Sequence, residues 1–315
     1  MKTLQVVSAL ILFAILFVSH ADAQMAKATL VVVSEKGDPI EGVDTGVGFE
    51  VNTISGIESN SSRGLTGSDG RFSARGDCDG IMFFNARKAG YYYSSSRYDF
   101  KTKNLFGWQP WNPELKVVLR KIENPIPMYA RKTDNLMIPV VGEPIGFDMV
   151  AFDWVSPYGK GHKSDFIFTV EKEVKSKREF TSKLIIEFDN EYDGIQVFKE
   201  KWFYGSEMKL PRFAPETGYA KSMELKFDNS PVCGISKTSE KDDNYIFRIR
   251  SKEENGKIIA MYGKIIGPIK FEPRNETANF IFKYYLNPDY TRNLEFDPKR
   301  NLFGKLPPLE RVGIK

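Results

Sequence analysis

The chain has 315 residues, of which 41% are hydrophobic and 13% aromatic, so it can bury a substantial core and is long enough for about two domains. Its 45 Lys and Arg residues and 41 Asp and Glu residues leave a net charge of +4, without an arginine-rich tract. This charge is too small and too dispersed to indicate a nucleic-acid partner.

The first 23 residues have the three parts of a secretory signal peptide. Lys2 precedes an apolar run from Val6 to Val18, and the small-residue site Ala21-Asp22-Ala23 precedes Gln24. We expect cleavage before Gln24 and an exported protein that is periplasmic, displayed on the cell surface or secreted; an uncleaved membrane anchor is the alternative. No later segment approaches the ~20 apolar residues of a spanning helix, so no transmembrane span is expected after signal removal.

Short strands separated by turns are predicted for the first part of the mature chain. Residues 27–35 read KATLVVVSE, whose β-branched valines precede a Gly-Asp-Pro turn, and residues 47–51 read VGFEV. Residues 52–64, NTISGIESNSSRG, are predicted as a polar loop. Further strands are expected in GIMFFNARKAGYYYSS and ELKVVLRK, and no convincing amphipathic helix is found, so the pattern is all-β.

Four short motifs in this part follow one another in a characteristic order. They are GDPIEG at 37–42, TGSDGRF at 66–72, KAGY at 88–91 and VVLRK at 117–121. Together they resemble the carboxypeptidase regulatory-like domain, over about residues 27–122. The resemblance implies a transthyretin-like Greek-key sandwich and a non-catalytic accessory role, and it carries over no functional residues.

Prolines at the junction place a domain boundary near residues 123–127. The β pattern continues through residues 127–315 in segments such as KLIIEF, NYIFRIR and NFIFKYYL, which predict a larger β-sandwich-like domain. The tail beyond Asn287 is expected to be loop-like and to pack Leu294, Phe296 and Phe303 on the body. The segments DWVSPYGKG, YGKIIG and NLEFDPKRNLF resemble an uncharacterised family of exported bacterial proteins, which implies no activity.

Two places combine aromatic and polar side chains in a way that suits a binding surface. Two tryptophans in a proline-containing loop either stack on a sugar or partner chain or cap an end of the first sandwich. Residues 146–168 predict a hairpin whose loop presents polar and aromatic groups, with a plain structural hairpin as the alternative. The candidate ligand-binding residues are Trp108, Trp111, Trp154, Tyr158, Lys160 and His162.

Histidine usage limits the catalytic classes. His162 is the only histidine after the signal, which excludes the two-histidine site of a zinc carboxypeptidase. A Ser-His-Asp or Cys-His arrangement through His162 lacks a supporting nucleophile motif. A glycan-degrading hydrolase that uses Asp148, Asp153 and Asp165 is the remaining enzymatic alternative, because these carboxylates are predicted on neighbouring strands.

Residues 189–200 follow the ligand spacing of a calcium loop, with Gly194 at the sixth position. The flanking segments look like strands rather than helices, and a polar hairpin turn is the alternative to calcium. No other cofactor is expected. The candidate ligands are Asp189, Glu191, Asp193 and Glu200.

Cys78 and Cys233 are the only cysteines, and export permits a disulfide between them without requiring one. The sequence therefore predicts an exported, non-catalytic binding or structural protein, directed toward an extracellular polysaccharide or an envelope protein. The hydrolase described above is the alternative.

Overall fold

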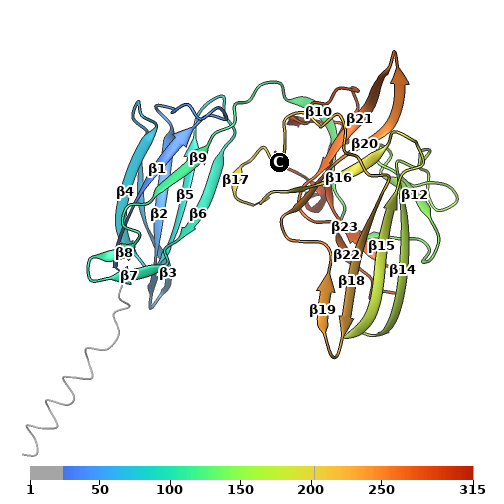
Figure 1. The fold of residues 1–315 in the computed structure, drawn as a ribbon, viewed down its shortest axis with the longest axis horizontal. Helices are drawn as coiled ribbons and strands as arrows, with labels where there is room; N and C mark the ends of the chain where they lie inside the picture. The colour runs from blue at the N-terminus through green and yellow to red at the C-terminus, as the bar shows by residue number, and fades with distance from the viewer. Residues whose placement is uncertain (1–23, 202, 315) are drawn as a thin grey trace, which may run out of the picture. The chain divides into compact units, whose positions relative to one another are not determined.

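The computed structural model describes residues 24–201 and 203–314, and within them the protein is all-β, as the sequence predicts (Figure 1). The predicted signal peptide lies outside these residues. The described part of the chain contains no helix that is long and apolar enough to cross a bilayer. The chain divides into two compact units: unit 1 runs through Ile122 and includes Tyr204–Ser206, and unit 2 comprises Glu123–Phe203 and Glu207 onward.

Unit 1 is a β-sandwich. A three-stranded sheet has the order β4-β1-β9, a five-stranded sheet has the order β17-β6-β5-β2-β3, and β7 and β8 form a separate hairpin. The strands are β1 Gln24–Val33, β2 Asp44–Thr53, β3 Gly56–Leu65, β4 Arg71–Cys78, β5 Ile81–Arg87, β6 Ser94–Asp99, β7 Thr102–Asn104, β8 Gly107–Gln109, β9 Glu114–Val118 and β17 Gly205–Ser206.

The core of unit 1 follows from the two-residue period of its strands. Leu30 and Val32 of β1 alternate with less buried neighbours, and Val47 and Phe49 of β2 do the same. These side chains meet in one buried cluster because the two sheets turn their apolar faces toward each other.

Strand β3 contradicts the prediction of a loop over residues 52–64. It pairs antiparallel with β2 along ten residues, from Asp44 opposite Leu65 to Thr53 opposite Gly56. Because β3 is an edge strand, most of its side chains face solvent. Polar residues can therefore occupy this strand without being buried in the core. The apolar alternation that identifies a half-buried strand is therefore missing.

The described residues of unit 2 form three sheets. Their strand orders are β16-β20-β21-β24-β10-β25, β13-β12-β14-β15-β18-β19 and β11-β23-β22. The elements are β10 Ile126–Lys132, β11 Leu136–Met137, β12 Ile145–Asp148, β13 Asp153–Trp154, β14 Phe166–Ser176, β15 Glu179–Glu187, β16 Gly194–Lys199, β18 Ser222–Ser230, β19 Gly234–Lys237, β20 Asp243–Glu254, β21 Lys257–Ile265, β22 Lys270–Glu272, β23 Asn279–Ile281, β24 Lys283–Asn287, β25 Phe296–Asn301 and the 3-10 helix η1 Pro308–Glu310.

The sheet that contains β20 is buried on both faces. Tyr245 and Phe247 of β20 enter the main core, whereas Ile246 between them enters a second apolar cluster on the opposite face. Leu210 and Leu294 belong to this second cluster and help to cover it. A strand with both faces covered shows a continuous apolar run, which explains the sequence NYIFRI.

The tail was predicted to be loop-like, and in part this is wrong, because β25 pairs in parallel with β10. Its predicted packing is confirmed: Leu294 and Phe296 are buried, and Phe303 packs against the main core.

Candidate functional site

Arg250 brings two of the three candidate carboxylates together. Strand β20 carries a β-bulge between Ile249 and Lys252, and Arg250 there has a left-handed backbone with φ of 52°. Its guanidinium donates from Nε to Asp165 Oδ1 at 2.7 Å and from Nη2 to Asp165 Oδ2 at 2.8 Å. Nη2 also donates to Asp148 Oδ1 at 2.9 Å. The two carboxylates therefore lie close together, and they share one cation.

Asp148 is further surrounded by backbone donors. Its oxygens accept hydrogen bonds from the N–H groups of Val150, Ala151, His162 and Lys163. Burial acts to raise the pKa of Asp148, but the donors from Ala151 and His162 together with Arg250 hold that pKa below its ordinary value. A carboxylate held ionised by five donors fixes the surrounding loops and is poorly suited to donating a proton.

The other two carboxylates are also engaged. Burial, together with the neighbouring charge of Asp148, raises the pKa of Asp165, although Arg250 and the Met149 N–H act to lower that pKa. Asp153 accepts hydrogen bonds of 2.9 Å from the backbone N–H groups of Trp154 and Lys160. The three carboxylates therefore hold loops and strands in place through hydrogen bonds and ion pairs. Their arrangement does not support the hydrolase alternative, which needs two carboxylates directed at a substrate.

The predicted hairpin over residues 146–168 consists of β12 and β14 with the short β13 beside them. Tyr158, Lys160 and His162 are exposed on its loop. Trp154 is only 7% exposed, and its ring packs edge-on against Phe147 with the centroids 5.1 Å apart. Because β13 turns Trp154 into the core, its ring is not available to contact a ligand, contrary to the prediction.

The two tryptophans of unit 1 have different environments. Trp108 packs against the core, and its Nε1 donates to the Cys78 carbonyl at 2.7 Å. Trp111 is 46% exposed. Trp108 therefore caps the end of the sandwich, which is one of the two predicted alternatives. The Trp111 ring is open to solvent and remains accessible to a ligand or partner.

The candidate calcium ligands are not gathered into a metal site. Asp193 turns inward and accepts hydrogen bonds from the backbone N–H groups of Arg250 and Ser251 at 3.0 and 2.8 Å. Strand β16 then carries the chain away for six residues, roughly 20 Å, before Glu200. No group of three or more potential ligands occurs among the described residues. Strands therefore stand where helices close an EF-hand loop, and the four candidate ligands do not converge on one point.

The cysteines do not form a disulfide. Cys78 is buried in unit 1, Cys233 is exposed in unit 2, and both thiols are free. Burial raises the pKa of the Cys78 thiol, which makes it less reactive than an exposed cysteine.

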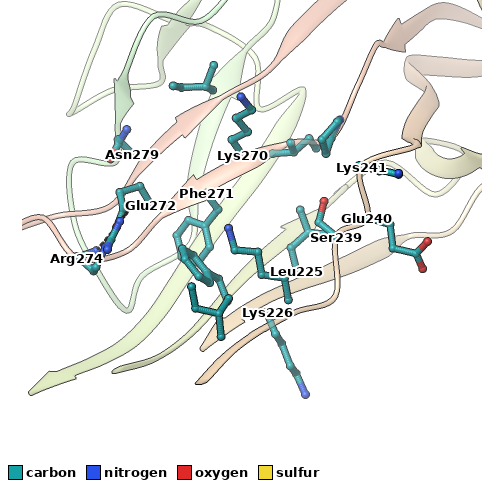
Figure 2. A pocket seen from close by; sticks show the side chains of 16 residues that line it. Leu225, Lys226, Ser239, Glu240, Lys241, Lys270, Phe271, Glu272, Arg274 and Asn279 are labelled. Carbon is teal, nitrogen blue, oxygen red and sulfur yellow. Dashed lines mark hydrogen bonds and ion pairs between the residues drawn. The ribbon is translucent and has the colours of Figure 1, made fainter. Parts of the chain in front are cut away.

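A large groove in unit 2 involves none of the residues selected from the sequence. Its volume is about 720 Å³, and it lies where two sheets end, at the edge strands β19 and β22. Figure 2 shows Phe271 and Leu225 near its centre, with Glu272 and Arg274 on one side and Glu240 and Lys241 on the other. We call it the edge groove.

The floor of the edge groove is continuous with the main core. Leu225, Phe227, Ile269 and Phe271 line it, and each is less than a tenth exposed. In contrast, all four residues of β19 are exposed, including Ile235 at 66%. Among the described residues β19 pairs only with β18, and β22 pairs only with β23. The groove therefore presents apolar surface between two open strand edges.

The rim of the edge groove is basic. Its two carboxylates are already paired, Glu272 with Arg274 and Glu240 with Lys199. Four further cations lie on the rim, and within the described part of the chain none of them is in an ion pair. Lys237 instead places its Nζ 3.8 Å from the centroid of the Phe227 ring. These four cations are Lys226, Lys237, Lys241 and Lys270.

A smaller hollow of about 300 Å³ extends this groove, and the two share Pro268, Lys270 and Ile281. It adds Lys132 and Lys283 to the lining. The groove could not be predicted from the sequence, since its cations come from separate segments and no short motif joins them. Its clearest local signal was the apolar Ile235 in an otherwise polar, exposed strand.

No family model matches the sequence, and no curated protein matches it. The structure is similar, at a low level, to that of a mutant of the shaft pilin SpaA from Lactobacillus rhamnosus GG, with 10% identity over 71% of this chain and 86% of that one and a TM-score of 0.24. The major pilin subunit BcpA of Bacillus cereus gives 11% identity, 86% and 100% coverage and a TM-score of 0.24. A proposed carbohydrate-binding protein from Bacteroides uniformis gives 12% identity, 82% and 97% coverage and a TM-score of 0.19.

TM-scores this low establish neither a shared fold nor a shared function. The class of the protein is therefore set by its own structure: an all-β protein of two units, with a basic, apolar-floored groove at the open edges of two sheets.

Proposed function

We propose that this chain is an exported, non-catalytic binding protein, and that the edge groove of unit 2 holds an acidic, extended segment of another envelope protein. The observation that carries the proposal is the combination of two open strand edges, an apolar floor and four rim lysines in one groove. The accessory role implied by the resemblance of unit 1 is compatible with this function.

The chemistry of the groove favours a polypeptide over a polysaccharide. An extended chain can donate and accept hydrogen bonds along an open strand edge, and its alternate side chains point to opposite faces. One set of side chains would then reach the apolar floor near Leu225 and Phe271, while acidic groups meet the rim lysines. Sugar binding instead relies on exposed aromatic faces, and Phe227 and Phe271 are both only 8% exposed.

The test is binding of the chain from Gln24 onward to a fluorescein-labelled peptide of alternating glutamate and valine, measured by anisotropy. We expect saturable binding that weakens as salt is added, because the rim charges are exposed. The double substitution Lys237→Glu and Lys270→Glu should weaken it by roughly tenfold or more at low salt. Lys36→Glu with Lys177→Glu is the matched control, since it makes the same charge change at exposed lysines outside the groove.

Two further probes separate the alternatives. Methylating alternate backbone nitrogens of the peptide removes donors without changing its charge, so strand pairing predicts a clear loss of affinity. Polygalacturonate serves as an acidic polysaccharide. Binding of polygalacturonate in preference to the peptide, or equal binding of the methylated peptide, would replace the strand-pairing proposal with recognition of charge alone.

A further inference from the structure

One end of unit 1 collects apolar side chains that are left in water. We define it by the turn between β2 and β3, the turn at Asp79 and Gly80, the β7–β8 hairpin and the first residues of β1 (Figure 1). The exposed large apolar residues of this tip are Met25, Ile54, Ile57, Leu105, Phe106 and Trp111. Ile54, Leu105 and Phe106 are between 84% and 105% exposed, so they contribute almost nothing to the core.

Hydrogen bonds and close packing hold these segments together as one surface. Asp79 accepts a hydrogen bond of 2.6 Å from the Asn52 backbone N–H, which ties the turn at Asp79 to the β2–β3 turn. Trp108 of the β7–β8 hairpin donates to the Cys78 carbonyl, which ties this hairpin to the same turn. A Cβ at Gly107 would lie 2.3 Å from the Met25 carbonyl oxygen, so the hairpin also lies directly on the start of β1.

The hairpin is built to present its apolar tip. Asn104 and Gly107 are opposite each other in the β7–β8 pair, so Leu105 and Phe106 form the connecting turn. Gly107 has φ of 126°, a conformation that favours glycine, and its lack of a Cβ permits the close approach to Met25. The Asn104 side chain accepts a hydrogen bond of 2.9 Å from the Phe106 N–H, which stabilises the turn. Two large apolar residues at a turn stabilised in this way are unfavourable in water unless something covers them.

We infer that this tip docks on a lipid surface. Aliphatic and phenyl side chains at the ends of hairpins can enter the acyl region, with a tryptophan such as Trp111 at the headgroup level. The chain enters unit 1 at Gln24, within this tip, and the apolar run from Val6 to Val18 lies just before it in the sequence. The tip is therefore the part of unit 1 that follows directly on the expected secretory signal.

Insertion rather than charge drives this contact. Lys103 belongs to β7 of the hairpin and Lys101 precedes that strand, but Glu58 and Asp79 lie at the same end, so the tip has no strong excess of positive charge. Each side chain of the size of Leu105 or Phe106 is expected to contribute roughly a tenfold increase in partitioning. Binding should therefore occur on neutral lipid and should not require an anionic headgroup.

The test is sedimentation of the chain from Gln24 onward with phosphatidylcholine vesicles, with and without phosphatidylglycerol. This chain keeps every described strand and lacks the apolar run, which would bind lipid by itself. We expect retention on both vesicle types, and a loss of at least about tenfold in Leu105→Ser with Phe106→Ser. Val232→Ser with Leu309→Ser removes similarly exposed side chains from unit 2 and should leave retention unchanged.

Vesicles of brominated lipid provide a second readout, because bromine quenches a nearby indole. Trp111 should be quenched, and Trp111→Phe should reduce the quenching. Trp108, the other tryptophan of the tip, packs against the core and is expected to contribute less, and Trp154 is buried in unit 2. No retention on either vesicle type, retention that the Leu105 and Phe106 substitutions do not alter, or retention only with phosphatidylglycerol would each overturn the inference. Self-association through the tip without lipid would assign this surface to a second copy instead.

Discussion

Arg250→Met removes the cation that Asp148 and Asp165 share, while it keeps a long side chain and a non-glycine residue at the bulge. Removing one partner of a buried ion pair costs about 3–5 kcal/mol. Asp148 retains four backbone donors, whereas Asp165 retains the Met149 N–H as its hydrogen-bond donor. Most of the lost free energy of unfolding therefore comes from leaving the Asp165 carboxylate without its cation. Because the Arg250 side chain is 24% exposed, we expect the lower end, about 3 kcal/mol.

The assay is urea unfolding followed by tryptophan fluorescence, together with a thermal melt in which the midpoint should fall by roughly 6–12 °C. Asp165→Asn removes the buried charge that needs Arg250. The cost of Arg250→Met should therefore be smaller in the Asp165→Asn background than in the unsubstituted protein. Equal costs in both backgrounds, or a cost below about 1 kcal/mol, would refute the role assigned to this ion pair.

The pH dependence gives a second check on Arg250. The pKa of Asp165 is raised in the folded protein, so its ionisation lowers stability as the pH rises through that pKa, and Arg250 limits the loss. Without Arg250 the folded-state pKa of Asp165 rises further. The stability lost in Arg250→Met should therefore be largest above this pKa and should shrink as the pH falls below it.

Two further substitutions test the hairpin region. Gly161→Ala should destabilise unit 2 by about 1–3 kcal/mol, because its Cβ would lie 2.7 Å from the Asp153 carbonyl oxygen; Gly313→Ala, where nothing lies within 4 Å, is the control in the same thermal melt. Trp154→Ala should cost about 3–5 kcal/mol in urea unfolding, because it empties a core position, whereas Trp111→Ala should change stability by less than about 1 kcal/mol. A stable Trp154→Ala protein would contradict the inward placement of that ring.

The all-β class and many strands could be predicted because half-buried strands carry an apolar period of two. The alternation that turns Leu30 of β1 and Phe49 of β2 into one core is an example. Strand β3 could not be predicted in this way, because an exposed edge strand needs no apolar face. For the same reason, polar composition alone does not identify a loop.

The site was less accessible from sequence than the fold. Asp148, Asp153 and Asp165 were predicted on neighbouring strands, but Arg250, which contacts Asp148 and Asp165, is 85 residues beyond Asp165, at a bulge that no local pattern marks. Trp154 was assigned to the surface because composition does not reveal which face of a two-residue strand turns inward. The edge groove was missed because its lysines belong to strands and loops that only the tertiary structure brings together.

The pairing of β10 has a consequence for the order of folding. It is the first strand of unit 2, yet its two neighbours are β24 and β25, near the end of the chain. Tyr129 pairs with Leu286, which is 157 positions later (286 − 129). Closing so long a loop is slow, so both edges of β10 stay unpaired until nearly the whole polypeptide has been synthesised. A chain that stops before Lys283 would leave β10 without either partner and prone to aggregate.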